Sequence, residues 1–291
     1  MCRLFGFRSQ GPSAVHRSLV RENNALQVQS REHPDGWGIG WWGDDGAAPQ
    51  LVRGAGAAYA EEAFTRHAEM VSSHAVLAHI RKASVGPVTL DNAHPFRWGP
   101  WLFAHNGTVT DFARHQARIE QEIDAAFAHV VIGDTDSARC FGIFLSRLAR
   151  LTPDPTSDVP LATAARALAE TVRTVSAITD PDAAVPSATT FLVGNGSLML
   201  AIRRGRTLWY STHKTRCPER GTCARFGPTC EAPPAAPGTE VNHMLIASER
   251  VSLEDAWIEV PVDGIVGVDA QMRLHRFQLG NWRKRSDSSA A

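Results

Sequence analysis

The sequence has no excess of charge of either sign and no long apolar segment. Its 30 Lys and Arg residues equal its 30 Asp and Glu residues, so the formal net charge at pH 7 is zero. Proteins dedicated to nucleic acids or membrane surfaces usually carry a net positive charge. No apolar run approaches the roughly 18–20 residues that cross a bilayer. We therefore expect neither a nucleic-acid partner nor a membrane partner.

Signals for secretion and for common cofactors are also missing. The first residues lack the charged and then apolar layout of a secretory signal, which predicts a cytoplasmic protein. The chain has no GxxxxGK[ST] run and no GxGxxG run with the flanking strand and helix that nucleotide binding needs. The sequence therefore indicates no nucleotide, flavin or other cofactor.

Cysteine is scarce, and its odd number, 5, does not suit a secreted disulfide framework. Three cysteines fall in a Pro- and Cys-rich segment at 213–238, namely Cys217, Cys223 and Cys230. Together with His213 they offer four soft ligands, but their spacing differs from the tight CxxC of a zinc ribbon. We predict no metal site and keep a metal-binding loop as the alternative.

The second residue is a candidate nucleophile. If Met1 is removed, Cys2 carries a thiol and a free α-amine on one residue. That amine has a reference pKa of about 7.7–8, so part of it is unprotonated near neutral pH. A weak nucleophile needs an adjacent base, and here the base belongs to the same residue. The alternative for Cys2 alone is a buried small residue, since free cysteine is commonly buried.

The apolar pattern predicts strands first, two long helices in the middle, and strands again. Predicted strands lie at 4–7, 37–42, 50–52, 76–81, 101–104, 189–193, 198–203, 208–212, 244–248, 265–268 and 274–277. Predicted helices lie at 60–70, after the N-cap candidates at 134–136, at 161–178 and, weakly, at 14–26. This order suits layered α+β packing, because the βαβ alternation of a doubly wound fold is not evident.

Six segments follow one another in an order and spacing that resemble the class II glutamine amidotransferase domain. They are Cys2, Asp35-Gly36-Trp37-Gly38, His79-Ile80-Arg81, His94-Pro95-Phe96, His105-Asn106-Gly107 and Asp134-Thr135-Asp136. The resemblance covers about residues 2–260. It looks closest to stand-alone bacterial members and to relatives that cleave γ-glutamyl compounds.

The resemblance implies a fold and a domain plan. The fold is an α+β, four-layer αββα sandwich of the N-terminal nucleophile hydrolase type, with Cys2 at the end of a central strand. We expect one domain over residues 2–283. The segment at 213–238 would be an insertion that shorter members lack, and the polar tail at 284–291 would be mobile.

The resemblance also assigns the catalytic roles. Cys2 would attack the amide carbonyl and form a γ-glutamyl thioester. The side-chain NH₂ of Asn106 and the backbone N–H of Gly107 would hold the oxyanion, which needs preorganised donors. The alternative for this dipeptide is an ordinary Asn-Gly hairpin turn.

Three further residues would bind the substrate. Arg81 would hold the α-carboxylate with its planar fork of donors, the alternative being a surface ion pair. Asp136 would accept from the α-ammonium while Asp134 or Thr135 caps the helix. His94 is assigned to the substrate pocket, although it also suits a supporting position.

Other residues near these segments have weaker assignments. His79 and His105 suit supporting positions. Ser84 and Asn92 lie close to Arg81 in the sequence and are secondary candidates for the pocket wall.

These roles predict an enzyme that hydrolyses the side-chain amide of glutamine. No synthase domain is evident, so a true amidotransferase would need a separate synthase partner. One alternative is a stand-alone hydrolase of γ-glutamyl peptides or thiols. A catalytically silent partner subunit is another, which an unprocessed Met1 would favour. Bile-salt and penicillin hydrolases also begin Met-Cys but lack the context of Asn106-Gly107 and 134–136.

Overall fold

The structure is a computed structural model that describes residues 2–43, 48–217, 220–221, 226–227, 230–232 and 235–282. Cys223 and the predicted tail at 284–291 lie outside the described residues.

Two antiparallel sheets form the centre of the molecule. The first contains β1 (Arg3–Ala14), β2 (Trp37–Trp41), β3 (Gln50–Gly54), β4 (Ser72–Ile80), β9 (Trp209–Ser211), β10 (His243–Ala247) and β11 (Ile258–Glu259). The second contains β5 (Phe96–Trp98), β6 (Trp101–Thr108), β7 (Ala188–Gly194), β8 (Met199–Ile202), β12 (Gly264–Val268) and β13 (Leu274–Gln278). The strand orders are β11-β9-β10-β1-β4-β2-β3 and β13-β12-β8-β7-β6-β5. The strand that follows Cys2 is therefore central, with β10 and β4 on its two sides.

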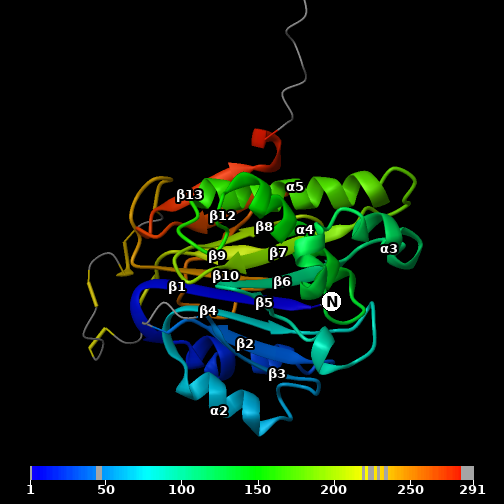
Figure 1. Cartoon of the computed structure of the whole chain (residues 1–291). Coiled ribbons are helices and arrows are strands. Elements are labelled where there is room, and N and C mark those ends of the chain that lie inside the picture. The colour runs from blue at the N-terminus through cyan, green and yellow to red at the C-terminus, as the bar shows by residue number, and fades with distance from the viewer. Residues whose placement is uncertain are drawn as a thin grey trace, which may run out of the picture.

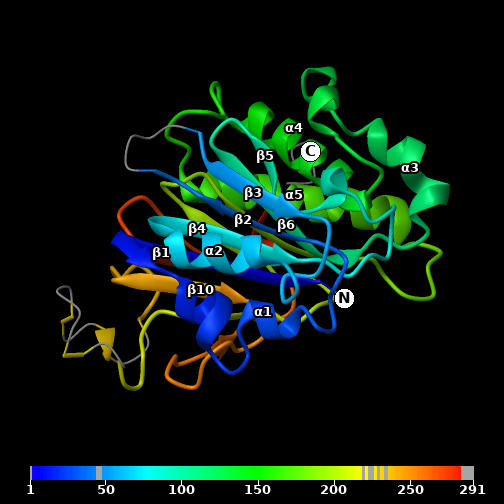
Figure 2. The same ribbon diagram turned by 90° about the horizontal axis from the view of Figure 1, so that it is seen from below.

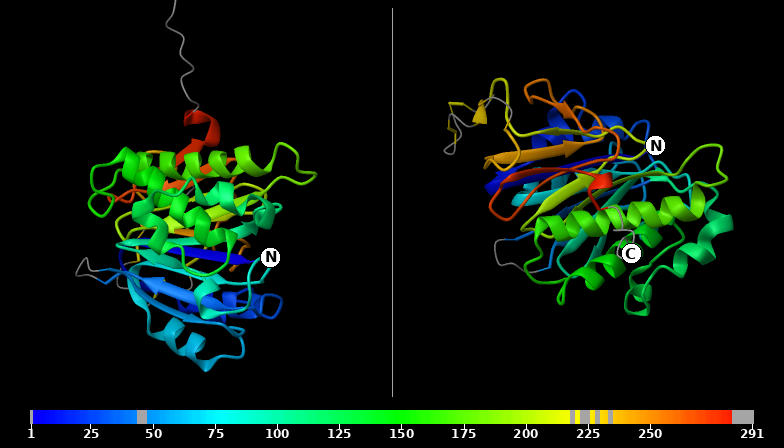
Figure 3. Two further views of the ribbon diagram at one scale, coloured as in Figure 1. Left: turned by 45° about the vertical axis from the view of Figure 1, so that its right-hand side comes forward. Right: turned by 90° about the horizontal axis from the view of Figure 1, so that it is seen from above.

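Helices cover the outer faces of both sheets (Figures 1 and 2). The second sheet carries α3 (Phe112–Glu120), α4 (Asp136–Leu151) and α5 (Leu161–Thr179), and the first carries η1 (Arg17–Arg21), α1 (Leu26–Gln29) and α2 (Glu62–Met70). Three short 3₁₀ helices are η2 (Leu90–Asn92), η3 (Ala125–Val130) and η5 (Leu279–Trp282). Figure 3 shows the long green helices lying across one face of the sandwich. The expected α+β, four-layer αββα sandwich is confirmed. Within the described part of the chain, no helix is long and apolar enough to cross a membrane.

Apolar side chains fill the space between the two sheets. Leu4 and Leu77 of the first sheet and Leu102 of the second are fully buried in this layer. The sheets approach each other closely at Gly6, where a Cβ atom would lie 2.8 Å from the sulfur of Met199. A side chain at this position would push the sheets apart, because interiors of this density have no spare volume.

Most predicted elements are present, with two differences in the first sheet. Strand β1 continues to Ala14, and its far end pairs with Ser72 of β4. The weak helix predicted at 14–26 is therefore replaced by the short η1 and α1, because strand pairing outweighs a weak local helical pattern. The short β11 was not predicted.

Strand β6 also differs from its prediction in a way that matters for the site. The apolar run suggested an end at residue 104, but the strand continues to Thr108 because Asn106 and Gly107 pair with β7. Side chains alternate between the two faces of a strand. Phe103 and His105 face the helical layer, whereas Ala104 and Asn106 face the first sheet. The Asn-Gly pair is thus not a hairpin turn.

Candidate active site

Cys2 lies at the start of β1, next to the end of β4. Its sulfur is 3.5 Å from the backbone nitrogen and 3.6 Å from the backbone oxygen of Lys82. The side chain is buried, and burial raises the pKa of the thiol above its usual value of 9.0. The Lys82 backbone and the charge of Arg81 act in the opposite direction, and Asp136 adds to the rise. The thiol therefore needs a base before it can attack a carbonyl.

Asn106 joins the second sheet to the strand that begins beside Cys2. Its side-chain nitrogen donates to the hydroxyl of Ser248 over 3.0 Å, and the same hydroxyl accepts from the backbone N–H of Leu4 over 2.9 Å. The side-chain oxygen of Asn106 is buried and has no hydrogen-bond partner. The hydroxyl of Ser248 thus links the buried side-chain amide of Asn106 to the backbone of Leu4, which is two residues after Cys2.

Gly107 occupies a position where no other residue fits. A Cβ atom there would lie 1.8 Å from the carbonyl oxygen of Ala188 in β7 and 2.5 Å from Nε2 of His105. Glycine is therefore required for β6 and β7 to approach each other next to Asn106.

Arg81 is buried and points into a backbone loop. Its Nη1 donates to the carbonyl of Pro87 over 2.9 Å, and its Nη2 donates to Val85 over 2.9 Å and to Gly86 over 3.3 Å. The side chain is therefore not part of a surface ion pair. Three of its five N–H donors are engaged by this loop, which leaves two for a ligand.

The loop at 82–89 begins beside Cys2 and is held by hydrogen bonds at several points. The backbone N–H of Ala83 donates to the carboxylate of Asp35 over 2.8 Å. The hydroxyls of Ser84 and Thr108 lie 2.9 Å apart, so the loop also contacts the residue after Gly107. Asp35 belongs to a segment that carried the sequence resemblance, but its role as an anchor of this loop was not predicted.

Asn92 connects this loop to the segment before α4. Its side-chain nitrogen donates to Pro87 over 3.0 Å, and its oxygen accepts from the backbone N–H of Asp134 over 2.9 Å. The side chain is fully buried. Asn92 therefore links the segment held by Arg81 to the segment that carries Asp136.

Asp136 is the first residue of α4. Thr135 caps the helix by accepting from the N–H of Ala138 over 3.2 Å, as expected from the sequence. The carboxylate of Asp136 accepts from the backbone N–H of Val109 over 2.7 Å and of Ser137 over 2.8 Å. It is buried, and its charge acts on the pKa of Cys2, Arg81 and His105, so it lies among them.

Three buried histidines lie behind these residues. Nε2 of His79 is 3.1 Å from the carbonyl oxygen of His105 and 3.0 Å from Nδ1 of His94. A carbonyl only accepts, so Nε2 of His79 carries a proton and Nδ1 of His94 accepts. Burial lowers the pKa of His79 to about 3 and that of His94 well below 6.5. His94 thus contacts interior groups in this structure, which favours the supporting position, and its place in a substrate pocket stays a prediction.

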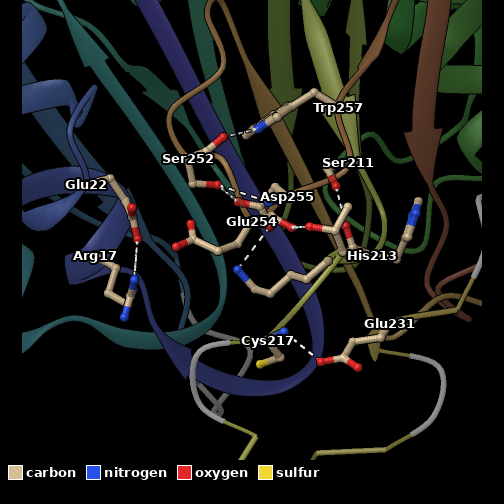
Figure 4. A network of polar contacts seen from close by, with 12 residues as sticks. Arg17, Glu22, Ser211, His213, Cys217, Glu231, Ser252, Glu254, Asp255 and Trp257 are labelled. Atoms are coloured by element: carbon tan, nitrogen blue, oxygen red, sulfur yellow. Dashed lines mark hydrogen bonds and ion pairs between the residues drawn. The ribbon is translucent and has the colours of Figure 1, made fainter.

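Two cavities among the described residues lie away from these side chains. The larger, about 410 Å³, is lined by the far half of β1, by η1 and by part of the insertion, including Cys217 and Cys230. Figure 4 shows Asp255 in the middle of this region, with Ser252 above it and Cys217 below. No group of three or more metal-ligating side chains occurs within the described ranges, and Cys223 lies outside them.

Comparisons with known proteins identify the family of this chain. Residues 1–217 match the class II glutamine amidotransferases. The probable glutamine amidotransferase DUG3 of Saccharomyces cerevisiae is 26% identical over 308 residues, covering 94% of this chain and 83% of the yeast protein. A gamma-glutamyl-hercynylcysteine sulfoxide hydrolase of Mycobacterium tuberculosis is 38% identical over 120 residues, which cover 38% of this chain and only 50% of the mycobacterial protein.

Solved structures share the fold at low sequence identity. A glutamine aminotransferase class-II domain protein of Silicibacter pomeroyi superposes with a TM-score of 0.63 and 17% identity, over 95% of this chain and 99% of its own. The glutamine phosphoribosylpyrophosphate amidotransferase of B. subtilis gives a TM-score of 0.57 and 15% identity, over 98% of this chain and 50% of its own. Since the family match covers residues 1–217 of 291, this chain belongs to the class II glutamine amidotransferases, a family of enzymes.

Proposed function

We propose that the protein hydrolyses the side-chain amide of glutamine or of a γ-glutamyl compound, with Cys2 as the nucleophile. The observation that carries this proposal is the position of the Cys2 thiol. It lies in contact with Lys82 and within the electrostatic influence of Arg81 and Asp136. In β1, the strand that follows Cys2, Leu4 donates to the hydroxyl of Ser248, which also contacts the side-chain amide of Asn106.

The reaction would begin with proton transfer from the thiol to the α-amine of Cys2 after removal of Met1. The sulfur then bonds to the amide carbon, and the carbonyl oxygen becomes an oxyanion. When the C–N bond breaks, the leaving ammonia or amine takes the proton from the α-ammonium. Water next attacks the thioester and gives one proton to the α-amine. The C–S bond then breaks to release glutamate, and the α-ammonium returns its proton to the sulfur of Cys2. The raised thiol pKa supports the need for this built-in base.

The oxyanion would be held by the side-chain NH₂ of Asn106 and the backbone N–H of Gly107. Preorganised donors of this kind stabilise the charge that develops in the transition state, and loss of one typically lowers the rate about 10²–10³-fold. The close packing of Gly107 against β7 supports a rigid site, because neither residue can shift without disturbing the strand pair.

The amino-acid head group would be held by Arg81 and Asp136. The two N–H donors of Arg81 that the loop leaves unused suit a carboxylate, and Asp136 suits an ammonium group. Both side chains are buried, so a substrate that lacks either charge would leave one of them without compensation. His94 would support this site from behind.

The leaving group separates two versions of the proposal. A true amidotransferase releases ammonia to a synthase partner, whereas a stand-alone hydrolase releases a larger amine from a γ-glutamyl peptide or thiol. The relatives are named for both kinds of activity. A catalytically silent subunit remains the alternative of another class.

A substrate panel with the purified full chain tests the proposal. Release of glutamate would be followed for glutamine, γ-glutamyl dipeptides and γ-glutamyl thiols, and intact mass would report removal of Met1. We expect turnover of at least one substrate by the protein that lacks Met1, and none by Cys2→Ala. Retained turnover in Cys2→Ala, or a processed and folded protein inactive on the whole panel, would contradict the proposal.

A further inference from the structure

Ser248 lies directly after β10 and forms two hydrogen bonds with the backbone of Leu4 in β1. Its hydroxyl accepts from the backbone N–H of Leu4 over 2.9 Å, and its own N–H donates to the carbonyl of Leu4 over 3.1 Å. Its carbonyl accepts from the hydroxyl of Thr207 over 3.1 Å. The side chain is buried. Ser248 is therefore fixed in register with the residue two positions after Cys2.

The hydroxyl of Ser248 meets the side-chain amide of Asn106 across the gap between the sheets. In the arrangement with Nδ2 nearest, 3.0 Å from the hydroxyl, Ser248 accepts two hydrogen bonds and its own proton has no acceptor among the described residues. The oxygen of Asn106 is at the same time buried without a donor. An unused donor and an unused acceptor thus belong to two side chains already in contact.

A half-turn of the Asn106 amide pairs these two groups. Oxygen and nitrogen of a carboxamide occupy equivalent places, so the hydroxyl of Ser248 can donate to the oxygen while still accepting from Leu4. The NH₂ group then takes the buried place where the oxygen had no partner. Two N–H donors in a buried place require an acceptor, and a developing oxyanion is one.

We propose that Ser248 is a positioning residue that holds Asn106 by its amide oxygen and so directs the NH₂ group toward the reacting carbonyl. This inference rests on the proposed function, because the acceptor is the oxyanion formed when Cys2 attacks. The hydroxyl of Ser248 also accepts from the N–H of Leu4 in β1, the strand that follows Cys2. It therefore fixes Asn106 of the second sheet relative to Cys2, which directly precedes β1 of the first sheet.

The first test is Ser248→Ala, measured on the substrate that the panel identifies. We expect kcat to fall about 10–100-fold, below the roughly 10²–10³-fold loss for a missing oxyanion donor. KM should change less than threefold, because Ser248 does not touch the groups assigned to the head group. Ser248→Thr keeps the hydroxyl and should restore most of kcat.

Ser73→Ala is the matched control for the loss of a buried hydroxyl. Ser73 is also buried, and its hydroxyl bonds the backbone of Trp42 over 2.6 Å and of Ala75 over 3.1 Å. It lies at the opposite end of β4 from Arg81. We expect Ser73→Ala to lower thermal stability while leaving kcat unchanged.

A double-mutant cycle with Asn106→Ala separates positioning from a general structural effect. If Ser248 acts through Asn106, adding Ser248→Ala to Asn106→Ala should lower kcat no further. Multiplied losses in the double variant would overturn the inference, and so would a folded Ser248→Ala with wild-type kcat. If Ser248→Ala does not fold, Ser248→Cys under reducing conditions replaces it, and an unchanged kcat there would overturn the inference.

Failure of the proposed function gives a different pattern. If Cys2→Ala or Asn106→Ala retains turnover, the mechanism itself is wrong. If both lose turnover while folded Ser248→Ala does not, only the role of Ser248 is wrong.

Discussion

The sulfur of Cys2 lies 3.5 Å from the backbone nitrogen of Lys82, a residue 80 positions later in the chain. This contact places the thiol at the start of the loop whose backbone carbonyls accept three hydrogen bonds from Arg81. The ends of two adjacent strands, β1 and β4, thus bring Cys2, the proposed nucleophile, close to Arg81, the residue proposed to bind the carboxylate.

Replacement of the nucleophile should remove activity with little effect on folding. We expect Cys2→Ala to lower turnover to background and to change the free energy of unfolding by less than about 1 kcal/mol, since the thiol makes only weak hydrogen bonds. Cys140→Ala is the matched control, because Cys140 is also a buried cysteine but belongs to α4 and packs in the core. It should cost stability and leave kcat intact. Circular dichroism and a turnover assay measure both effects.

Arg81 should affect substrate binding more than stability. Arg81→Ala removes three hydrogen bonds to the loop, but Gly86 and Pro87 are exposed and water can replace the lost donors. We expect about 1–2 kcal/mol of destabilisation and a rise in KM of at least tenfold. Arg21→Ala, which removes only a surface ion pair with Glu69, is the control and should leave KM unchanged. A similar KM for wild type and Arg81→Ala would remove Arg81 from the substrate site.

Gly107 should tolerate no side chain. The Cβ of Gly107→Ala would lie 1.8 Å from the carbonyl oxygen of Ala188, so β6 and β7 must separate. We expect a loss of more than about 3 kcal/mol, together with loss of activity. Gly280→Ala is the control, because nothing lies within 4 Å of a Cβ there. Urea unfolding of the two variants gives the comparison, and equal midpoints would contradict the packing argument.

Stability should fall in mild acid because of the buried histidines. Burial lowers the pKa of His79 from 6.5 to about 3, so between these values the unfolded chain binds a proton that the folded chain does not. Stability therefore decreases as pH falls through this window, by up to about 1.4 kcal/mol per pH unit for this one group. His79→Gln keeps a donor for the carbonyl of His105 and should flatten the dependence. Urea unfolding at pH 7.5, 6 and 5 measures the slope, and an unchanged slope in His79→Gln would contradict this origin.

Local signals in the sequence predicted the elements that depend on nearby residues. The helix after 134–136 begins with a Thr135 cap, because that hydroxyl bonds a backbone N–H only three residues later. The apolar runs of β4 and β7 were recognised because both strands are buried along most of their length. The end of β6 was missed because its last residues are polar, although they pair with β7 like the apolar ones.

The local pattern of the sequence does not predict contacts between segments that are far apart in the chain. Ser248 is 142 residues from Asn106 and 244 residues from Leu4, and no local spacing relates them. The contacts of Arg81 depend on the path of the loop at 82–89, which no apolar period determines. The resemblance supplied the candidate residues, whereas the contacts that hold them required the three-dimensional structure.

Side chains of β6 alternate between its two faces, so the direction of the Asn106 side chain depends on the register of β6 against β7. Phe103 and His105 face the helices, and Asn106 faces the first sheet. A slip of one residue against β7 would exchange these faces and turn Asn106 into the helical layer, with its amide directed away from Ser248 and from the beginning of the chain. A single-residue insertion or deletion within β6 before Asn106 is therefore expected to lower activity even where the sandwich survives it.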